Sequence, residues 1–404
     1  MSVSVRVPTE PLHRPALGIV LCLLTVFGPI SMDLYLPVLP ALTTDLGTTT
    51  SGAQLTVTAC LLGLALGQVV AGPVSDRFGR RRPLLVGVAA YVVASVLCAL
   101  APTIETLVAA RLLQGLAGAV GIVIAQAAGR DLFTGARLLR YYGGLTVLAG
   151  LAAIVGPVVG GQLAKVTDWR GTFVFLAALG VVILAAGAAV LRETLPPLRR
   201  RTGGLTESIH GFRRLLADPV FLGATLVTGF ANAAVFAYLS GATFVLQDGY
   251  GLSPQGYSLA FGLNSLGFMV LGYVAGRTSA GLSVHGTLVA GLAMVVAGAA
   301  GVLVTGVLQL PLPAIVISLL VMVSGVAVTT PPSTALALEH HADVAGTASS
   351  LLGLARFGFG AVAAPLVGVV GSATAASLGA VALVAAACAV GGCTLTRRPA
   401  RARA

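Results

Sequence analysis

Two ionisable side chains stand within long apolar stretches of the sequence, where a charge is costly. Asp33 lies in the stretch 16–41 and Arg111 in the stretch 106–128. A carboxyl group in apolar surroundings can take up and release a proton, and a guanidinium beside it changes how readily it does so. Counted at helical rise, Asp33 lies about 12 Å and Arg111 about 8 Å from the same membrane surface. We therefore expect the two to meet, with Asp33 carrying protons and Arg111 tuning it; a static ion pair is the alternative.

Other polar and aromatic residues in the apolar stretches are candidates for lining a ligand cavity. They are Tyr35, Gln68, Gln114, Asn232, Phe236, Tyr238, Phe261 and Asn264. For each of these residues alone, an interhelical hydrogen bond or packing against lipid is an equal alternative. Arg356 also joins the cavity candidates because it is a charge within an apolar stretch. Its alternative is a side chain that extends to the membrane surface.

The sequence shows no constellation for covalent or metal chemistry. No G-x-x-x-x-G-K-[ST] segment and no nucleophile with a partner base stands out, so neither an enzyme nor an ATP-driven machine is expected. The five cysteines are scattered singly along apolar runs and are interpreted as buried thiols. His340 and His341 lie in a polar connection, where a solvated loop is a better interpretation than a metal site.

The elements that carry these residues are predicted to be membrane-spanning helices. Of the 404 residues, 57% are hydrophobic and 9% are charged, which is typical of a polytopic membrane protein. Apolar runs of about 20 residues predict twelve spans: 16–41, 52–72, 84–101, 106–128, 141–164, 171–191, 219–246, 257–276, 286–308, 312–331, 345–368 and 372–395. The polar connection 192–218 divides them six and six. We therefore predict an all-α integral membrane protein of two pseudo-symmetric six-helix bundles, 16–191 and 219–395, with tails 1–15 and 396–404.

The basic residues predict how these spans are oriented. With the N-terminus in the cytoplasm, 20 of the 24 Lys and Arg residues fall on the cytoplasmic side. Lys165 and Arg170 fall outside, and Arg111 and Arg356 lie within spans. This bias predicts a protein of the bacterial inner membrane with both termini on the cytoplasmic side. It also explains the net charge of +11 without a nucleic-acid partner.

Residues 72–85 concentrate charge in a short connection between two spans. They follow the pattern G-x-x-x-D-R-x-G-R-R, formed by Gly72, Asp76, Arg77, Gly79, Arg80 and Arg81. The glycines allow a tight reversal and a close approach of helices, Asp76 can meet the positive end of another helix, and the arginines can pair with Asp131. A plain positive anchor is the alternative, but it explains neither the acid nor the two glycines.

A second segment, 150–161, is rich in glycine and interrupts a predicted span. Gly156, Gly160 and Gly161 remove side chains from one helix face, and Pro157 frees a backbone carbonyl and bends the helix. Together with Gly150 they predict a hinge between the bundles, packed against the span 257–276. General small-residue packing is the alternative.

These segments resemble the major facilitator superfamily. The segment 72–85 is similar to its loop 2–3 signature, and 150–161 is similar to the motif of its proton-coupled drug antiporters. Five further segments resemble the Bcr/CflA drug-resistance branch, which includes bicyclomycin and chloramphenicol exporters. They are 31–40, 111–118, 192–197, 238–245 and 345–351. The resemblance implies a latch that holds the outward-facing state, in which Asp76 faces the start of the eleventh span and Arg80 pairs with Asp131.

The resemblance also implies a function. It predicts a monomeric exporter of small lipophilic drugs, driven by protons and needing no cofactor. A carrier of a small metabolite with the same fold, for a sugar, an amino acid or a polyamine, is the alternative. A receptor or scaffold does not need Asp33 and Arg111 within the membrane, and no filter loop or ring of charge points to a channel.

Overall fold

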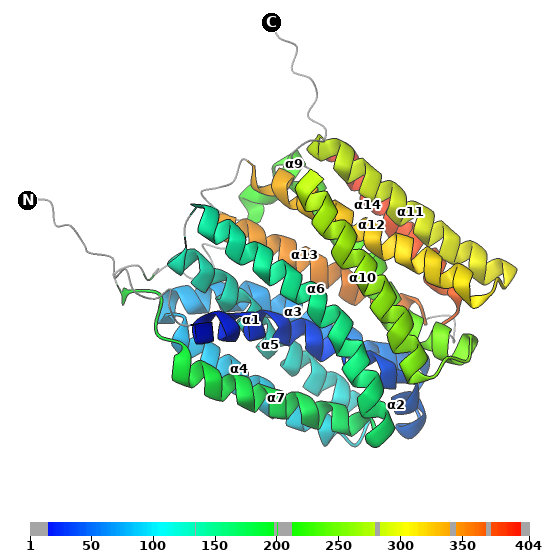
Figure 1. Cartoon of the computed structure of the whole chain (residues 1–404), viewed down its shortest axis with the longest axis horizontal. Helices are drawn as coiled ribbons and strands as arrows, with labels where there is room; N and C mark the ends of the chain where they lie inside the picture. The colour runs from blue at the N-terminus through cyan, green and yellow to red at the C-terminus, as the bar shows by residue number, and fades with distance from the viewer. Residues whose placement is uncertain are drawn as a thin grey trace, which may run out of the picture.

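The chain folds into long helices that lie side by side in two groups (Figure 1). The computed structural model describes residues 15–133, 135–197, 200, 212–278, 283–339, 345–368 and 373–396. The helices of the first half are α1 (Pro15–Asp33), α3 (Thr50–Phe78), α4 (Arg81–Ala99), α5 (Ile104–Leu132), α6 (Gly135–Val166) and α7 (Trp169–Val190). Those of the second half are α9 (Pro219–Phe244), α10 (Pro254–Thr278), α11 (Val284–Leu308), α12 (Leu312–Leu338), α13 (Ala345–Leu366) and α14 (Ala375–Leu395). The described residues contain no strand, so the predicted all-α class is confirmed.

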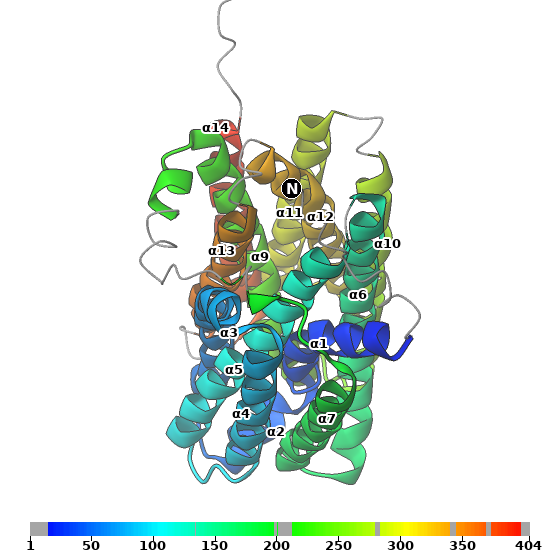
Figure 2. The ribbon, with the colours of Figure 1, turned by 90° about the vertical axis from the view of Figure 1, so that its left-hand side faces the viewer.

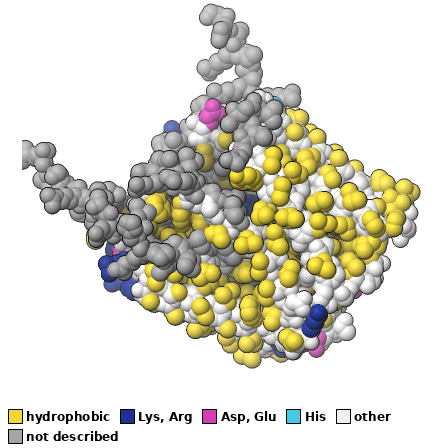
Figure 3. Space-filling model, in the orientation of Figure 1, with side chains coloured by type: hydrophobic (Ala, Val, Ile, Leu, Met, Phe, Trp, Pro, Cys, Tyr) yellow, Lys and Arg dark blue, Asp and Glu magenta, His cyan; other side chains and the backbone are white. Residues whose placement is uncertain are grey.

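Most of these helices are long and apolar enough to cross a membrane. Within the described residues ten helices meet that condition, with mean hydropathy between 1.3 and 2.7. The two other long helices, α1 and α6, have 19 and 32 residues. Hydrophobic side chains cover much of the face shown in Figure 3, and Lys and Arg gather near one edge of it. An apolar surface of this extent is what a bilayer requires of a multi-pass membrane protein.

The first predicted span, 16–41, is not one continuous helix. Helix α1 ends at Asp33 and is followed by a short 3-10 turn, η1 (Leu36–Val38), and a short helix, α2 (Leu39–Asp45). Pro37 has no N–H to donate to the carbonyl of Asp33, and its ring crowds that carbonyl, which favours a break in the helix at this point. The candidate proton carrier therefore stands at the end of a helix.

Several other helices extend beyond the predicted spans. Helix α3 continues to Phe78 instead of ending at residue 72, and α12 continues to Leu338 instead of 331. Membrane helices project beyond the apolar core, so hydropathy locates the centre of a helix better than its ends. As a result Asp76 and Arg77 lie on the last turn of α3 and not in a loop.

The two halves meet along two pairs of helices. Helix α3 of the first half packs against α13 of the second, and α6 packs against α10. Figure 2 shows the first half below and the second half above, with these pairs between them. We call the end of the molecule that carries the turn 78–81 the basic end, and the end that carries residues 45–50 the far end.

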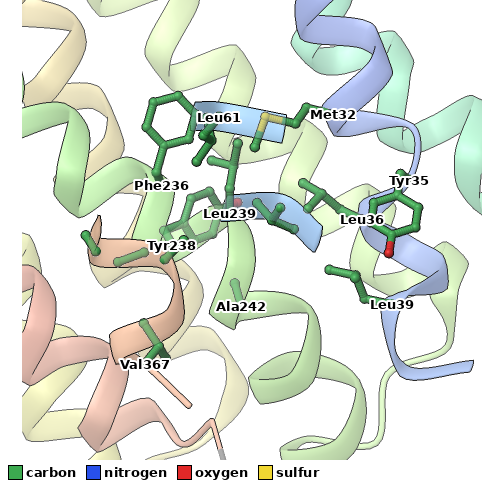
Figure 4. Packing of buried hydrophobic residues seen from close by; sticks show 14 of the residues in the cluster. Met32, Tyr35, Leu36, Leu39, Leu61, Phe236, Tyr238, Leu239, Ala242 and Val367 are labelled. Atoms are coloured by element: carbon green, nitrogen blue, oxygen red, sulfur yellow. The ribbon is translucent and has the colours of Figure 1, made fainter. Parts of the chain in front are cut away.

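Apolar side chains from both halves form one continuous core toward the far end. Figure 4 shows Met32, Tyr35, Leu36, Leu39 and Leu61 of the first half beside Phe236, Tyr238, Leu239, Ala242 and Val367 of the second. The two halves are therefore held together at this end by buried apolar surface as well as by the hydrogen bonds described below.

Candidate functional site

Asp33 is a buried carboxyl group at the interface between the two halves. Only 5% of the residue is exposed, and a Cβ added at Gly156 of α6 would lie 2.9 Å from the Cβ of Asp33. On the other side, Asp33 interacts electrostatically with the phenols of Tyr238 in α9 and Tyr257 in α10. Within the described residues its carboxylate forms no hydrogen bond and no ion pair. An isolated carboxyl in this position is well suited to hold a proton.

The expected contact between Asp33 and Arg111 is absent. Arg111 is fully buried, and its Nη1 donates hydrogen bonds of 2.6 Å to Gln114 Oε1 and 3.4 Å to the carbonyl of Ser31. Its guanidinium also lies over two rings, with Cζ 4.8 Å from the centroid of Tyr35 and 5.5 Å from that of Phe173. The hydrogen-bond partners of Arg111 thus lie within the first half, and its Nε and Nη2 are buried without a partner among the described residues.

The geometry of α1 explains why these two residues do not meet. Successive residues of a helix are rotated by about 100°, so Ser31 and Asp33 point to nearly opposite sides of α1. The Ser31 hydroxyl is hydrogen-bonded to the hydroxyl of Tyr91 in α4, which marks the side that faces α4 and α5. Asp33 faces α6 instead. The predicted depths of Asp33 and Arg111 are similar, but Asp33 points away from the side of α1 that faces Arg111.

The polar residues of the first half form a network within that half. Gln114 Nε2 donates to the Ser95 hydroxyl at 2.8 Å, and the Tyr35 and Thr56 hydroxyls are 2.9 Å apart. Both Tyr35 and Gln114 are fully buried. Their bonds join the segment after α1 to α3, and α5 to α4, which are interhelical hydrogen bonds of the kind given as the alternative. Gln68 is mostly buried against Gly353 of α13, on the boundary between the halves.

The aromatic residues of the second half form a layer behind Asp33. The rings of Tyr238 and Phe261 stack with centroids 5.5 Å apart, and Asn264 Nδ2 donates a hydrogen bond of 3.1 Å to the Tyr238 hydroxyl. Phe236 packs on Phe357 of α13, with centroids 5.7 Å apart. Asn232 donates to the carbonyl of Thr228 within its own helix at 2.8 Å and is mostly buried.

The segment 150–161 of α6 packs on two helices at once. Gly156 and Gly160 lie against Asp33 and Leu34 of the first half, where a side chain would not fit. Toward the second half, the carbonyl of Pro157 accepts a hydrogen bond of 2.7 Å from Ser258, and the carbonyl of Gly161 accepts one of 2.7 Å from Gln255.

Closer to the N-terminal end of α6, Gly150 lies beside Met269. Ser258, Gln255 and Met269 all belong to α10, which contains the eighth predicted span, so α6 has the packing partner that the sequence predicts.

The charged cluster at the basic end is centred on Arg80. Its Nε lies 2.9 Å from Asp131 Oδ2, which is the pair expected from the sequence, and its Nη1 lies 2.5 Å from Asp76 Oδ1. The side chain of Asp76 is 39% exposed and forms no hydrogen bond or ion pair to the described part of α13. The expected contact of Asp76 with the eleventh span is thus absent, and Gly72 has open space beside it.

Glu193 is a member of this cluster that sequence reasoning did not select. Its Oε1 accepts a hydrogen bond of 2.7 Å from the backbone N–H of Arg80. Burial alone would raise the pKa of Glu193, but this hydrogen bond, those from the backbone N–H groups of Leu195 and Arg81, and the charge of Arg200 outweigh it, so the pKa lies below its usual value. The signal available in the sequence was a single acid among basic residues directly after the sixth span.

Gly79 and Arg81 shape the same turn. Gly79 has a φ of 89° and lies against the Glu193 carboxylate, so both its backbone conformation and its lack of a side chain are needed there. Arg81 Nε donates a hydrogen bond of 2.9 Å to the carbonyl of Leu191. The turn is thereby tied to the end of α7.

At the far end, hydrogen bonds join the two halves directly. The Thr243 hydroxyl donates to the carbonyl of Leu36 at 2.9 Å, and Gln247 Nε2 donates to the carbonyl of Pro37 at 3.1 Å. The Ser51 hydroxyl donates to the carbonyl of Gly368 at 2.6 Å. These three hydrogen bonds between the halves all lie at this end. This structure is therefore closed at the far end.

Several predicted features lie outside the described residues. They are the tails 1–14 and 397–404, most of the connection 198–211, and His340 and His341. Of the five cysteines, Cys60, Cys98 and Cys393 are buried thiols, whereas Cys388 is exposed, contrary to the expectation of burial. The described residues contain no cluster of His, Cys, Asp and Glu that can hold a metal ion.

Two helical bundles, with a buried acid at their interface and a hydrogen-bonded closure at the far end, are the arrangement of a membrane transporter. The chain belongs to the Major Facilitator Superfamily, whose sequence model matches residues 21–365. It is 37% identical over 378 residues to the uncharacterized MFS-type transporter YdgK of Bacillus subtilis, covering 93% of each chain. It is 27% identical over 345 residues to the bicyclomycin resistance protein homolog of Haemophilus influenzae, covering 85% of this chain and 87% of the other.

A solved structure agrees with this assignment of the fold. The crystal structure of a D-xylose-proton symporter superposes with a TM-score of 0.72, covering 92% of this chain and 96% of the symporter. The sequences are 15% identical, so this similarity concerns the fold alone. The protein is a transporter and not an enzyme, and its similarity to resistance proteins places it in the drug-resistance branch of the superfamily.

Proposed function

We propose that this protein exports small amphipathic drugs in exchange for protons, with Asp33 as the proton carrier. The observation that supports this most directly is the position of Asp33: a buried, unpaired carboxyl at the interface between the halves. A carboxylate in such surroundings is costly when ionised, so its protonation state changes how stable the closed interface is. That dependence is what couples a proton to a movement of the bundles.

The orientation of the protein follows from its basic residues. The turn that carries Arg77, Arg80, Arg81 and Arg82 belongs at the cytoplasmic surface, as do both termini. The far end then faces outward, and the closure by Thr243 and Gln247 is an outer gate. The described arrangement corresponds to an inward-facing carrier, which can admit a drug from the cytoplasm or the inner leaflet.

The transport cycle uses Asp33 in two states. In the outward-facing state Asp33 takes up a proton from outside, because the interface around Gly156 and Tyr238 is then open. The neutral carboxyl is compatible with closure of the outer gate, and the inward-facing state releases the proton to the cytoplasm. Each proton that enters contributes about 2.3 kcal/mol per 100 mV of membrane potential, and export of a drug of low charge uses this free energy.

The latch at the basic end has a different role in the same cycle. Arg80 keeps its pair with Asp131 within the first half, whereas Asp76 has no partner in the second half here. We propose that Asp76 contacts the start of α13 when the basic end closes. The charge of Asp76 then stabilises the outward-facing state by meeting the positive end of that helix.

Drug transport into everted membrane vesicles tests the role of Asp33. Energised vesicles that carry the wild-type protein are expected to accumulate chloramphenicol. This accumulation is expected to stop when a protonophore is added. Asp33→Asn is expected to reduce the initial rate at least tenfold at equal expression. Asp45→Asn, which neutralises an exposed acid at the far end, is the control and is expected to stay within about twofold of wild type. Full protonophore-sensitive transport by Asp33→Asn would exclude Asp33 as the carrier.

A further inference from the structure

Arg356 lies in the middle of α13, on the side that faces the first half. Gly353, three residues earlier and on the same face, packs against Gln68 of α3. Arg356 is eleven residues from the start of α13 at Ala345. At helical rise that is about 16 Å, so its side chain cannot reach the basic end of the helix by extending along it. A side chain that extends to the membrane surface, the alternative interpretation, would have to cover much of that distance.

Arg356 is exposed at this position midway along α13. Within the described residues it forms no hydrogen bond and no ion pair, and its nearest described interaction is with the ring of Phe357, 5.6 Å from Cζ to the centroid. Arg356 forms no ion pair with Asp33, so Asp33 does not serve as its counterion. An accessible but unpaired guanidinium at this depth has no protein group that offsets its cost.

Two aromatic residues follow Arg356 on α13. Phe357 packs on Phe236, and Phe359 packs on Phe230 with centroids 4.8 Å apart. These rings offer an apolar, aromatic surface next to a cation. A ligand that matches this arrangement carries an acidic group on an apolar body.

We propose that Arg356 binds the acidic group of the substrate, and that the transporter accepts amphipathic carboxylates in addition to neutral drugs. The guanidinium offers two parallel N–H donors that match a carboxylate, and the phenylalanine rings contact the apolar body of the ligand. Neutral drugs use the aromatic surface without the cation. This inference rests on the proposed export function, because it assigns a substrate class to the same interface.

Two radiolabelled probes distinguish binding that needs the acidic group from binding that needs only the apolar body. Fusidate is a carboxylate on a large apolar skeleton, and chloramphenicol is neutral. Binding of each probe to the purified protein in detergent is measured by equilibrium dialysis, and transport of each is measured in everted vesicles. The variants are Arg356→Gln and Arg356→Lys, with Arg82→Gln as a control that removes one exposed arginine outside the interface. Size-exclusion chromatography confirms that each variant is folded.

Arg356→Gln is expected to weaken fusidate binding and fusidate transport at least tenfold, while chloramphenicol stays within about twofold. Arg356→Lys is expected to recover part of the fusidate binding, and Arg82→Gln is expected to match wild type with both probes. Equal losses with both probes would show a structural role for Arg356 and overturn the proposal, as would fusidate binding that is unchanged in Arg356→Gln or absent in wild type. If wild type binds fusidate through Arg356 but transports neither probe, the proposed export function fails and the binding assignment stands.

Discussion

Thr243 of α9 donates a hydrogen bond of 2.9 Å to the carbonyl oxygen of Leu36, and this bond joins the two halves at the far end. The same carbonyl also accepts the backbone N–H of Leu39 at the end of η1. In a continuous helix the N–H of residue 40 would bond to the carbonyl of residue 36, but proline has no N–H. Pro40 thus leaves room at the Leu36 carbonyl for the hydroxyl of Thr243.

Removal of this bond is expected to favour opening of the far end. Thr243→Val keeps the shape of the side chain but loses the hydroxyl, which costs the closed state about 1 kcal/mol and raises the open population about fivefold. The measurement is the rate at which a membrane-impermeant maleimide labels a cysteine at Ala242, a buried interface position, in a chain without native cysteines. Thr228→Val is the matched control, because the Thr228 hydroxyl bonds only within the second half. Equal labelling of both variants would contradict a gating role for Thr243.

Asp33 and Arg111 are expected to act independently on stability. Arg111 interacts with Gln114, Ser31 and aromatic rings, and not with Asp33. In a double-mutant cycle with Asp33→Asn and Arg111→Gln, the effects on the free energy of unfolding are expected to add within about 0.5 kcal/mol. Arg111→Gln alone is expected to destabilise the protein by about 3 kcal/mol, because buried hydrogen bonds and a close-packed side chain are lost. Denaturation in detergent micelles measures these values. A coupling free energy above about 1 kcal/mol would show that the two residues interact after all.

The glycines of α6 are expected to be intolerant of even one methyl group. Gly160→Ala places a Cβ against the backbone carbonyl of Leu34, which cannot move without shifting α1. Overpacking of this kind costs about 1–3 kcal/mol and is expected to lower the melting temperature. Gly144→Ala on the same helix is the control, since nothing lies within 4 Å of its added Cβ. That variant is expected to be neutral or slightly stabilising because alanine favours the helix. Similar melting temperatures for the two variants would argue against close α1–α6 packing.

Glu193 is expected to make the stability of the basic end depend on pH. Its pKa is depressed in the folded protein, so it contributes stability above its usual pKa of 4.5, and this contribution is lost as the pH falls through the lower folded value. Glu193→Gln is therefore expected to lower stability at pH 7 by about 1 kcal/mol and to match wild type in strong acid. The difference in melting temperature between the two proteins, followed from pH 7 to pH 3, checks the sign. A constant difference over that range would exclude the carboxylate as the cause.

Much of the fold was predictable because a bilayer imposes a simple condition on sequence. Each span must be helical and about 20 residues long, so runs of apolar residues reveal the class, and the polar connection reveals the division into halves. Helix ends were less predictable, as α3 and α12 show, because helices continue beyond the apolar core. Pro37 favours the end of α1 at Asp33, but a prediction of spans from mean hydropathy does not register a single proline.

The candidate site was predictable only in part. Local patterns identified Asp33, Arg80 with Asp131, and the glycines of α6, because composition and spacing alone make those residues unusual for a membrane span. The partners of Arg111 and Asp76 were not predictable, because a residue's depth gives its position along the membrane normal and not the direction in which it points. Glu193 joined the cluster through a contact between segments distant in the sequence.

By itself the sequence determined an all-helical membrane protein, its two halves and the small set of charges that the membrane must accommodate. Those properties depend on the free energy of transferring residues into lipid, which is a local quantity. Only the tertiary structure decided that Arg111 bonds within the first half, that Asp33 and Arg356 have no ion pair among the described residues, and that the far end is closed. Those properties depend on the rotation of each helix about its own axis and on which helices face each other across the interface.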